Sequence, residues 1–218
     1  EKPVKYADFQ FQLQAMAEIE IEFVRILKLL TSEKIYTAAG IDGCRYGYIV
    51  VLVNSLGEYC VKLINTIDEI LKIKADIYLI DMPIGFTDGG SDERFCDKVI
   101  RKMLQPYRAS SVFSLPTRGA LYANTYEEAN KINRQLSGKG LSKQIWTIFP
   151  KLREVDEFVL NNRYVVNCFF ESHPEVCFAE LLGSPCRNYK KTEEGELERI
   201  TVLKKYFDIE KMLSENNF

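Results

Sequence analysis

The sequence predicts a mixed α/β fold, and three observations lead to that prediction. A short apolar run at Tyr36–Ile41 is followed within six residues by a second one at Tyr48–Val53, which is the spacing of a β-hairpin. A third strand (Tyr59–Ile64), a helical segment and a fourth strand (Ala75–Ile80) come next. The fourth strand can return parallel to the first across this helical crossover. A fifth apolar strand, Tyr164–Phe170, follows a long region with helical signals.

The composition is that of one globular domain with additions at its ends. The chain has 218 residues, of which 46% are hydrophobic and 28% charged, so it can bury a sizeable core. We predict an N-terminal extension over residues 1–35, one domain over 36–207 and a C-terminal tail over 208–218.

Charge and cysteine usage exclude several classes of protein. The net charge of −2 gives no general attraction to nucleic acid or to an anionic membrane, and no apolar run reaches the length of a membrane span. The first residue is Glu, and no signal peptide is readable. Six cysteines without a CxxC pair, beside a single histidine, indicate reduced thiols in a cytoplasmic protein and argue against a zinc site.

The N-terminal extension has the pattern of an amphipathic helix. Apolar residues recur at helical spacing between Gln14 and Thr31, and charged residues fill much of the remaining surface. We expect this helix to pack on the domain or on a second subunit, which would make the protein a homo-oligomer. Alternating apolar residues around Phe9–Leu13 leave a strand as the other reading.

Each segment after the first hairpin has local signals of its own. Thr66 is a good N-cap for a helix over Ile67–Lys72, and Pro83 and Gly85 end regular structure after the fourth strand. A helical insertion is expected between the fourth and fifth strands, at about residues 86–160. Its helices are predicted at about 91–104, 126–136, 141–148 and 150–160, and two more follow the fifth strand at 176–182 and about 193–207.

Three of the predicted strands end in an acidic residue, namely Asp42, Asp81 and Glu171. In an open α/β sheet, ligands bind beyond the carboxyl ends of the strands. Clustered carboxylates repel one another, and a divalent cation removes that repulsion. Because the donors are oxygens, we expect Mg²⁺ or Mn²⁺ at this site. The alternative for each acid taken alone is a turn cap or an ion-pair partner.

Several long motifs resemble a known family. They are, in chain order, GIDGCRYGYIVVLV, IDMPIGF with Arg94 and Cys96-Asp97 after it, RASSVFSLPTRGALY, TYEEANKIN, KGLSKQIWTIFPKLREVDEF, ESHPEVCFAEL and KKTEEGELERITVL. Together they are similar to an uncharacterised family of predicted nucleases with the ribonuclease H-like fold, over about residues 37–205. The resemblance implies a five-stranded sheet, three strands antiparallel and two further strands parallel, with flanking helices and a long helical insertion.

The resemblance also implies a set of acidic site residues. Asp42 matches the first-strand aspartate and Asp81 the fourth-strand acid, while Glu171 or Glu175 matches the third. A fourth acid from a late helix would be Glu194 or Glu198, for which a solvent-facing helix position is the alternative. The implied activity is metal-dependent hydrolysis of phosphodiester bonds in nucleic acid or another phosphodiester, with Mg²⁺ or Mn²⁺ as cofactor.

Basic and aromatic residues supply candidates for substrate binding. The basic ones, which can contact phosphate, are Arg45, Arg108, Arg118, Lys151, Arg153, Lys190 and Lys191. Tyr107, Phe113 and Trp146 can stack on bases, although a core position is the more frequent role of such residues. His173 lies between Glu171 and Glu175, where it can act as a proton shuttle or as a hydrogen-bonded structural residue.

Two other functions are compatible with the sequence. The first is a phosphate- or nucleotide-binding protein related to actin-like ATPases, whose aspartate-glycine hairpin handles phosphate. Such proteins need two domains around the nucleotide, and this chain supplies one. The second is a non-catalytic binding module that keeps the fold and uses the insertion as a partner surface. It predicts no effect of divalent cations and no change when Asp42 is replaced by Asn.

Overall fold

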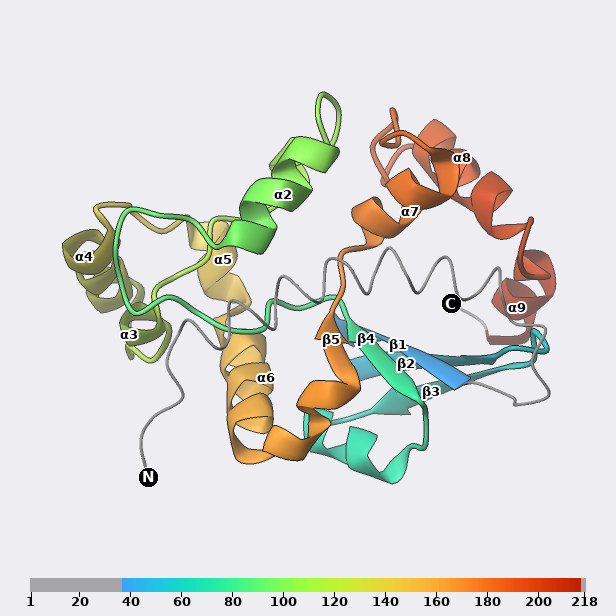
Figure 1. Cartoon of the computed structure of the whole chain (residues 1–218), viewed down its shortest axis with the longest axis horizontal. Coiled ribbons are helices and arrows are strands. Elements are labelled where there is room, and N and C mark those ends of the chain that lie inside the picture. Colours follow the sequence, from blue (N-terminus) through green and yellow to red (C-terminus); the bar gives the residue numbers. More distant parts are fainter. Residues whose placement is uncertain (1–36, 217–218) are drawn as a thin grey trace.

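The computed structural model describes residues 37–216, and they form a five-stranded mixed sheet flanked by helices (Figure 1). The strands are β1 (Thr37–Cys44), β2 (Gly47–Asn54), β3 (Tyr59–Ile64), β4 (Ile77–Ile80) and β5 (Phe169–Glu171). Their order in the sheet is β3-β2-β1-β4-β5. The pairs β1–β2 and β2–β3 are antiparallel, whereas β1–β4 and β4–β5 are parallel. The predicted mixed α/β sheet is therefore confirmed.

The first hairpin is tighter than its sequence suggests. Cys44 pairs with Gly47 across a turn made of Arg45 and Tyr46, so Asp42 lies within the paired part of β1. Gly47 has φ +135°, and a Cβ atom there would lie 1.9 Å from the Ile64 carbonyl oxygen. Only glycine fits this position, because both the backbone angle and the close approach of β3 exclude a side chain.

The two faces of the sheet differ in what they carry. Side chains alternate along each strand, so Ile41, Val50 and Ile80 share one face with the main hydrophobic core. That core is completed by helical residues such as Phe149 and Leu152. The opposite face carries Asp42 with its cross-strand partner Ile49. Because Ile41 points into the core, the next residue, Asp42, points away from it.

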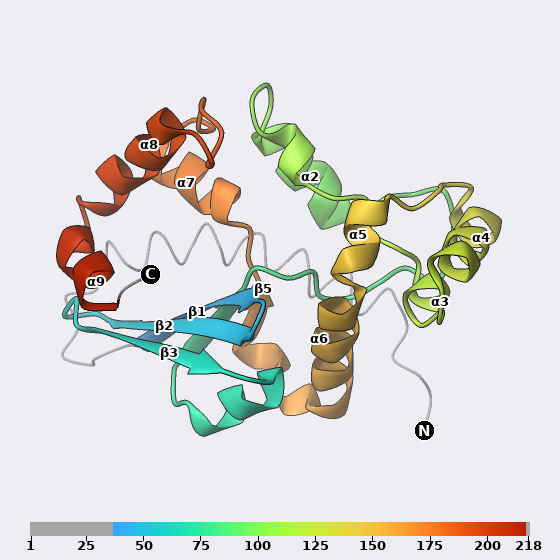
Figure 2. The ribbon, with the colours of Figure 1, turned by 180° about the vertical axis from the view of Figure 1, so that it is seen from behind.

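The chain between β4 and β5 is mainly helical, as predicted. Its helices are α2 (Phe95–Met103), η2 (Ala109–Ser111), α3 (Arg118–Leu121), α4 (Tyr126–Ser137), α5 (Lys143–Thr147), α6 (Phe149–Asn161) and η3 (Arg163–Asn167). The others are η1 (Ile67–Lys72) before β4, and α7 (Pro174–Leu182), α8 (Glu193–Leu203) and α9 (Ile209–Asn216) after β5. Figures 1 and 2 both show α2, α7 and α8 above the sheet and α6 beside it.

Several boundaries differ from the prediction, and three of the differences are the largest. The fifth strand is only β5, because the preceding residues form η3, in which Val165 is buried and Tyr164 is 67% exposed. β5 pairs with the short strand β4 through three residues, which limits its length. The helix expected at about 91–104 begins at Phe95, and a further helix, α9, forms in the expected tail.

Two further predictions concern the N-terminal helix and membrane-spanning segments. The helix predicted over residues 14–31 lies outside the described residues. Within residues 37–216, no helix combines the length and the apolar character needed to cross a membrane.

Candidate functional site

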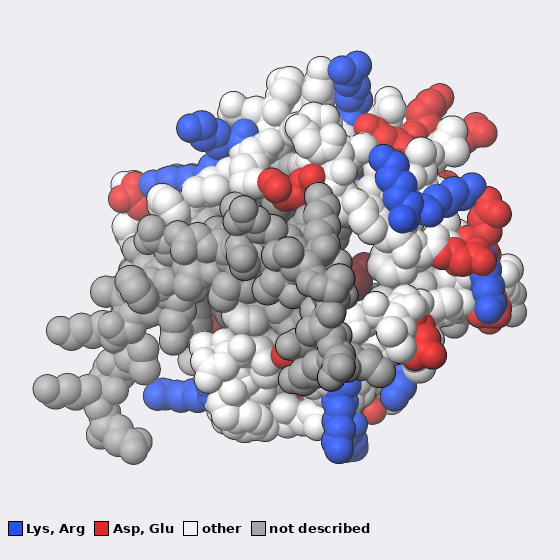
Figure 3. Space-filling view, turned by 45° about the vertical axis from the view of Figure 1, so that its right-hand side comes forward, with Lys and Arg blue, Asp and Glu red and all other residues white. Residues whose placement is uncertain are grey.

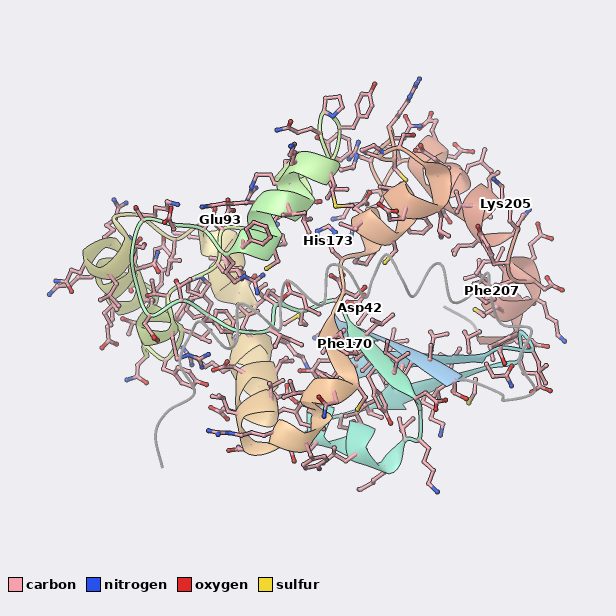
Figure 4. All side chains as sticks on the ribbon, viewed as in Figure 1. Asp42, Glu93, Phe170, His173, Lys205 and Phe207 are labelled. Atoms are coloured by element: carbon pink, nitrogen blue, oxygen red, sulfur yellow. The ribbon has the colours of Figure 1, made fainter. Side chains whose placement is uncertain are left out.

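Asp42 and Asp81 lie side by side near the carboxyl ends of the inner strands β1 and β4. The parallel register pairs Ile41 with Ile80, and the Asp81 N–H donates to the Ile41 carbonyl at 2.9 Å. Continuing that register by one residue brings Asp81 beside Asp42 on the face opposite the main core. Figure 4 labels Asp42 at the edge of the sheet where β5 leads into α7, with His173 nearby. The structure therefore brings together two of the three strand-end acids, Asp42 and Asp81.

The two carboxylates are electrostatically coupled. Burial, followed by the charge of Asp42, raises the pKa of Asp81 to about 6, and the charges of Glu171 and Glu175 act in the same direction. Burial also raises the pKa of Asp42. Lys190 opposes both shifts, so its ammonium group lies near both acids. The pair is a site where added positive charge is favourable.

The raised pKa of Asp81 predicts a pH-dependent effect of Asp81→Asn on stability. The folded state holds its proton up to about pH 6, whereas the unfolded state releases it near the ordinary value of 3.8. Ionised Asp81 therefore destabilises the fold, with no penalty below about pH 3.8 and the full penalty above about pH 6. After allowance for solvent screening, the Asn variant should be more stable than the wild type at pH 7.5 by on the order of 1 kcal/mol.

Thermal melts at pH 4 and pH 7.5 measure this difference. The exposed Asp68→Asn variant serves as the control for the chemical change. An Asp81→Asn variant that is equally stabilised at both pH values would show that Asp81 keeps an ordinary pKa in the folded protein.

Glu171 lies near these acids but faces the other way. Because it pairs with Ile80 in the parallel register, its side chain leaves the sheet on the core face, opposite that of Asp42 and Asp81. There its two carboxylate oxygens accept from the two terminal nitrogens of Arg94, each at 2.8 Å. The Ile84 N–H also donates to Glu171, at 2.8 Å. The residue beside Asp81 is instead Ser172, just after β5, whose N–H donates to the Ile80 carbonyl at 2.8 Å.

Arg94 is the centre of this second polar cluster. Its guanidinium is bidentate to Asp97 as well, at 2.8 and 2.6 Å, and donates to the carbonyl oxygens of Ile84 and Gly85. The Arg94 residue is 5% exposed and Asp97 is 4% exposed. The cluster therefore ties α2, the loop after β4 and the end of β5 together. Arg94 balances the charge of Glu171, so this carboxylate does not need a metal ion.

Glu175 is held in a similar way by α8. Both of its carboxylate oxygens accept from Nη2 of Arg199, at 2.6 and 2.7 Å, and both residues are buried. Arg199 also donates to the carbonyl oxygens of Asn188 and Gly195. Of the four acids considered as catalytic from the sequence, the structure thus leaves Asp42 and Asp81 without a buried arginine partner among the described residues.

A cleft of about 640 Å³ opens beside Asp81. Its lining includes Glu171, His173 and Glu175 on one side and residues 108–115 of the insertion on the other. Within the described part of the chain, Nδ1 of His173 is buried without a hydrogen-bond partner, and Nε2 lies 3.5 Å from the Ser111 hydroxyl. Burial lowers the pKa of His173, so the imidazole is neutral near pH 7.

The basic residues considered for substrate binding make different contacts, and only some of them line the cleft. Arg118 pairs with Asp156, Arg153 donates to the Leu121 and Ala123 carbonyls, and Lys151 lies over the Tyr48 ring at 3.9 Å. Arg45 lies on the β1–β2 turn beside Tyr46. Lys190 and Lys191 are exposed and line the cleft, whereas Arg108 lines it from a buried position. On the face shown in Figure 3, basic and acidic side chains are interspersed.

The late-helix acids have distinct surroundings. Glu194 is exposed on α8, and Glu198 accepts from the backbone N–H groups of Arg187 and Asn188. Among residues 37–216, no group of three or more His, Cys, Asp or Glu side chains is arranged to hold a metal ion. Sequence reasoning missed Arg94 and Arg199 as partners of the acids. The spacing of three residues between Arg94, the N-cap of α2, and Asp97 in its first turn is a sequence signal for an ion pair between them.

Comparison with protein families found one match. A family model described as "Protein of unknown function (DUF429)" matches residues 40–217. The search of curated proteins and the search of solved structures found no match.

Proposed function

This chain belongs to the DUF429 family, and from the geometry of its site we propose that it is a metal-dependent phosphodiesterase of the RNase H-like class, most simply a nuclease. The observation that carries the proposal is the pairing of Asp42 with Asp81, two coupled carboxylates at the carboxyl end of parallel strands and beside the cleft. The sheet combines three antiparallel strands with two further parallel strands, as the resemblance to RNase H-like nucleases implies, and this supports the proposal.

The donor set fits Mg²⁺ or Mn²⁺. Magnesium sites in enzymes of phosphate chemistry use one or two carboxylates together with oxygens of the substrate and water. Asp42 and Asp81 supply two carboxylates; burial raises the pKa of both, and the charge of Asp42 adds to the shift of Asp81, so a cation bound between them would be favourable. A bound divalent cation would activate water and stabilise charge on the phosphate.

The surrounding residues have roles that do not require direct contact with the cation. Lys190 lies near both acids and can hold a phosphate oxygen of the substrate at the cleft. Neutral His173, with its partnerless buried Nδ1 among the described residues, can accept or pass on a proton near the cleft. Arg94 and Arg199 hold Glu171 and Glu175, so these two acids shape the cleft walls.

A thermal melt with and without Mn²⁺ tests the metal site. A cation that binds the folded state at about 100 times its Kd adds about 2.7 kcal/mol to the free energy of unfolding, which raises Tm by about 5–10 °C for a chain of this size. We expect this rise in the wild type and in Asp68→Asn, and its loss in Asp42→Asn. An equal rise in Asp42→Asn would remove Asp42 from the site and contradict the proposal.

A non-catalytic binding module is the second candidate. It is favoured by the two buried arginines, which leave only a pair of the expected acids open, and by the lack of a metal-holding group of three within residues 37–216. Such a module would use the cleft without chemistry. It predicts that ligand binding persists in Asp42→Asn and that Mn²⁺ leaves Tm unchanged.

A further inference from the structure

The loop between α7 and α8 is exposed yet firmly anchored. Glu198 of α8 accepts from the N–H groups of Arg187 and Asn188, and Arg199 donates to the Asn188 carbonyl. The Tyr189 carbonyl accepts from the Thr192 N–H at 2.9 Å and from its hydroxyl at 3.0 Å. A loop held at so many backbone groups presents its side chains in a fixed position, which lowers the entropy cost of binding.

Arg108 anchors the same loop from the insertion and also supports the ring of Tyr189. Its Nε donates to the Cys186 carbonyl at 3.1 Å and its Nη2 to the Arg187 carbonyl at 2.7 Å. The guanidinium carbon lies 4.1 Å from the centroid of the Tyr189 ring, in cation–π geometry. Arg108 is 5% exposed, so its charge is used inside the protein rather than on a ligand.

The other face of the Tyr189 ring is open. Arg108 covers one face, but the residue is still 64% exposed, so the exposed surface lies on the opposite face and the ring edges. A solvated aromatic ring with a buried cation beneath it is a rigid, flat surface. Within residues 37–216, the hydrogen bonds that hold this loop are made by its backbone groups and by the Asn188 side chain, and they do not involve the Tyr189 ring.

The ring lies at the cleft next to two positive charges. Tyr189, Lys190 and Lys191 all line the cleft that contains Asp81, and Phe113, 43% exposed, lines it from the insertion. Lys190 is close enough to lower the pKa of both Asp42 and Asp81. A ligand that combines a flat ring with a phosphate can therefore contact Tyr189 and Lys190 together and still reach the acids.

We propose that Tyr189 is a base-stacking subsite, at which an unpaired nucleobase of a single-stranded nucleic acid lies on the open face of the ring while Lys190 and Lys191 contact the adjoining phosphates. This inference rests on the proposed function, since it names the substrate class of the same cleft. Stacking on one side chain requires an exposed base face, which a base inside a duplex does not offer. Single strands are therefore preferred over duplexes.

Binding of labelled oligonucleotides, followed by fluorescence anisotropy with EDTA present to prevent hydrolysis, tests the subsite. The probes are an oligothymidylate of about 12 nucleotides, the same backbone with abasic residues, and a duplex of equal length. The variants are Tyr189→Ala, Tyr189→Phe and Tyr189→Leu. Tyr164→Ala removes a tyrosine that is 67% exposed on η3, and it controls for the loss of an exposed ring.

We expect the wild type to bind the oligothymidylate about 5-fold or more tighter than the abasic strand and the duplex. Tyr189→Ala and Tyr189→Leu should abolish this preference, whereas Tyr189→Phe and Tyr164→Ala should keep it. Equal affinity for the oligothymidylate and the abasic strand, or no effect of Tyr189→Leu, would overturn the stacking subsite and leave the phosphodiesterase proposal intact. Lack of binding to every probe, together with a cation-induced rise in Tm that depends on Asp42, would also reject the subsite but keep the metal site. Lack of both would reject both proposals.

Discussion

Replacing Arg94 with methionine is expected to lower the free energy of unfolding by about 3–5 kcal/mol, the usual cost of removing one partner from a buried ion pair. Methionine fills a similar volume but leaves the carboxylates of Glu171 and Asp97 in a buried site without their shared cation. For a chain of this size the loss corresponds to a Tm lower by about 6–20 °C. Urea unfolding followed by circular dichroism measures the free energy directly.

Two further variants identify the cause of that loss. Arg163→Met makes the same chemical change at an exposed position and should cost less than about 0.5 kcal/mol. Adding Glu171→Gln to Arg94→Met removes one of the stranded charges, so the double variant should be more stable than Arg94→Met alone. If Arg94→Met is as stable as Arg163→Met, the Arg94 cluster does not contribute to stability in the way its geometry implies.

Asp42→Asn is expected to reduce Mn²⁺-dependent phosphodiester hydrolysis by at least about 100-fold. Even partners that only orient a metal ligand are worth about 10–100-fold in activity, and a ligand itself should be worth more. Asparagine keeps the shape of the side chain and removes its charge, which relieves the repulsion with Asp81, so Tm without cation should equal or slightly exceed that of the wild type. Initial rates on single-stranded oligonucleotides, measured at several Mn²⁺ concentrations, give the effect.

Glu171→Gln separates the structural acids from the acids proposed to hold the cation. Because Arg94 binds Glu171 on the opposite face of the sheet, this variant should lower Tm but keep the Mn²⁺ dependence of the rate within about 3-fold. Asp68→Asn should match the wild type in both respects. A loss of Mn²⁺ dependence in Glu171→Gln would instead place Glu171 among the cation's ligands, which requires the Arg94 pair to open when the metal binds.

Glu171 also shows how far the sequence could lead. Strand patterns correctly predicted the mixed sheet, and they placed an acid at the ends of three strands. They could not predict which face each acid occupies, because a register shift of one residue reverses the direction of a side chain. The register of β4 with β5 depends on three residue pairs and on the turn through η3, neither of which leaves a periodic signal.

The arginine partners were unpredictable for a different reason. Arg199 meets Glu175 from 24 positions along the chain, and Arg94 meets Glu171 from 77 positions away. Such pairs depend on how α2 and α8 pack against the rest of the fold, and no periodic pattern or short motif in the sequence indicates that packing. The same applies to Tyr189, whose ring is supported by Arg108 of a distant segment.

The helical region between β4 and β5 cannot be removed to make a smaller protein. Its last long helix, α6, supplies Phe149, Leu152 and Val155 to the same core that the sheet faces. A shortened chain without α6 would therefore expose the apolar face of the sheet to water. Deleting Arg94 with that region would also leave Glu171 charged and unpaired. An engineer who wants a minimal scaffold must therefore retain α6, and must recode Glu171 as a neutral residue whenever α2 is discarded.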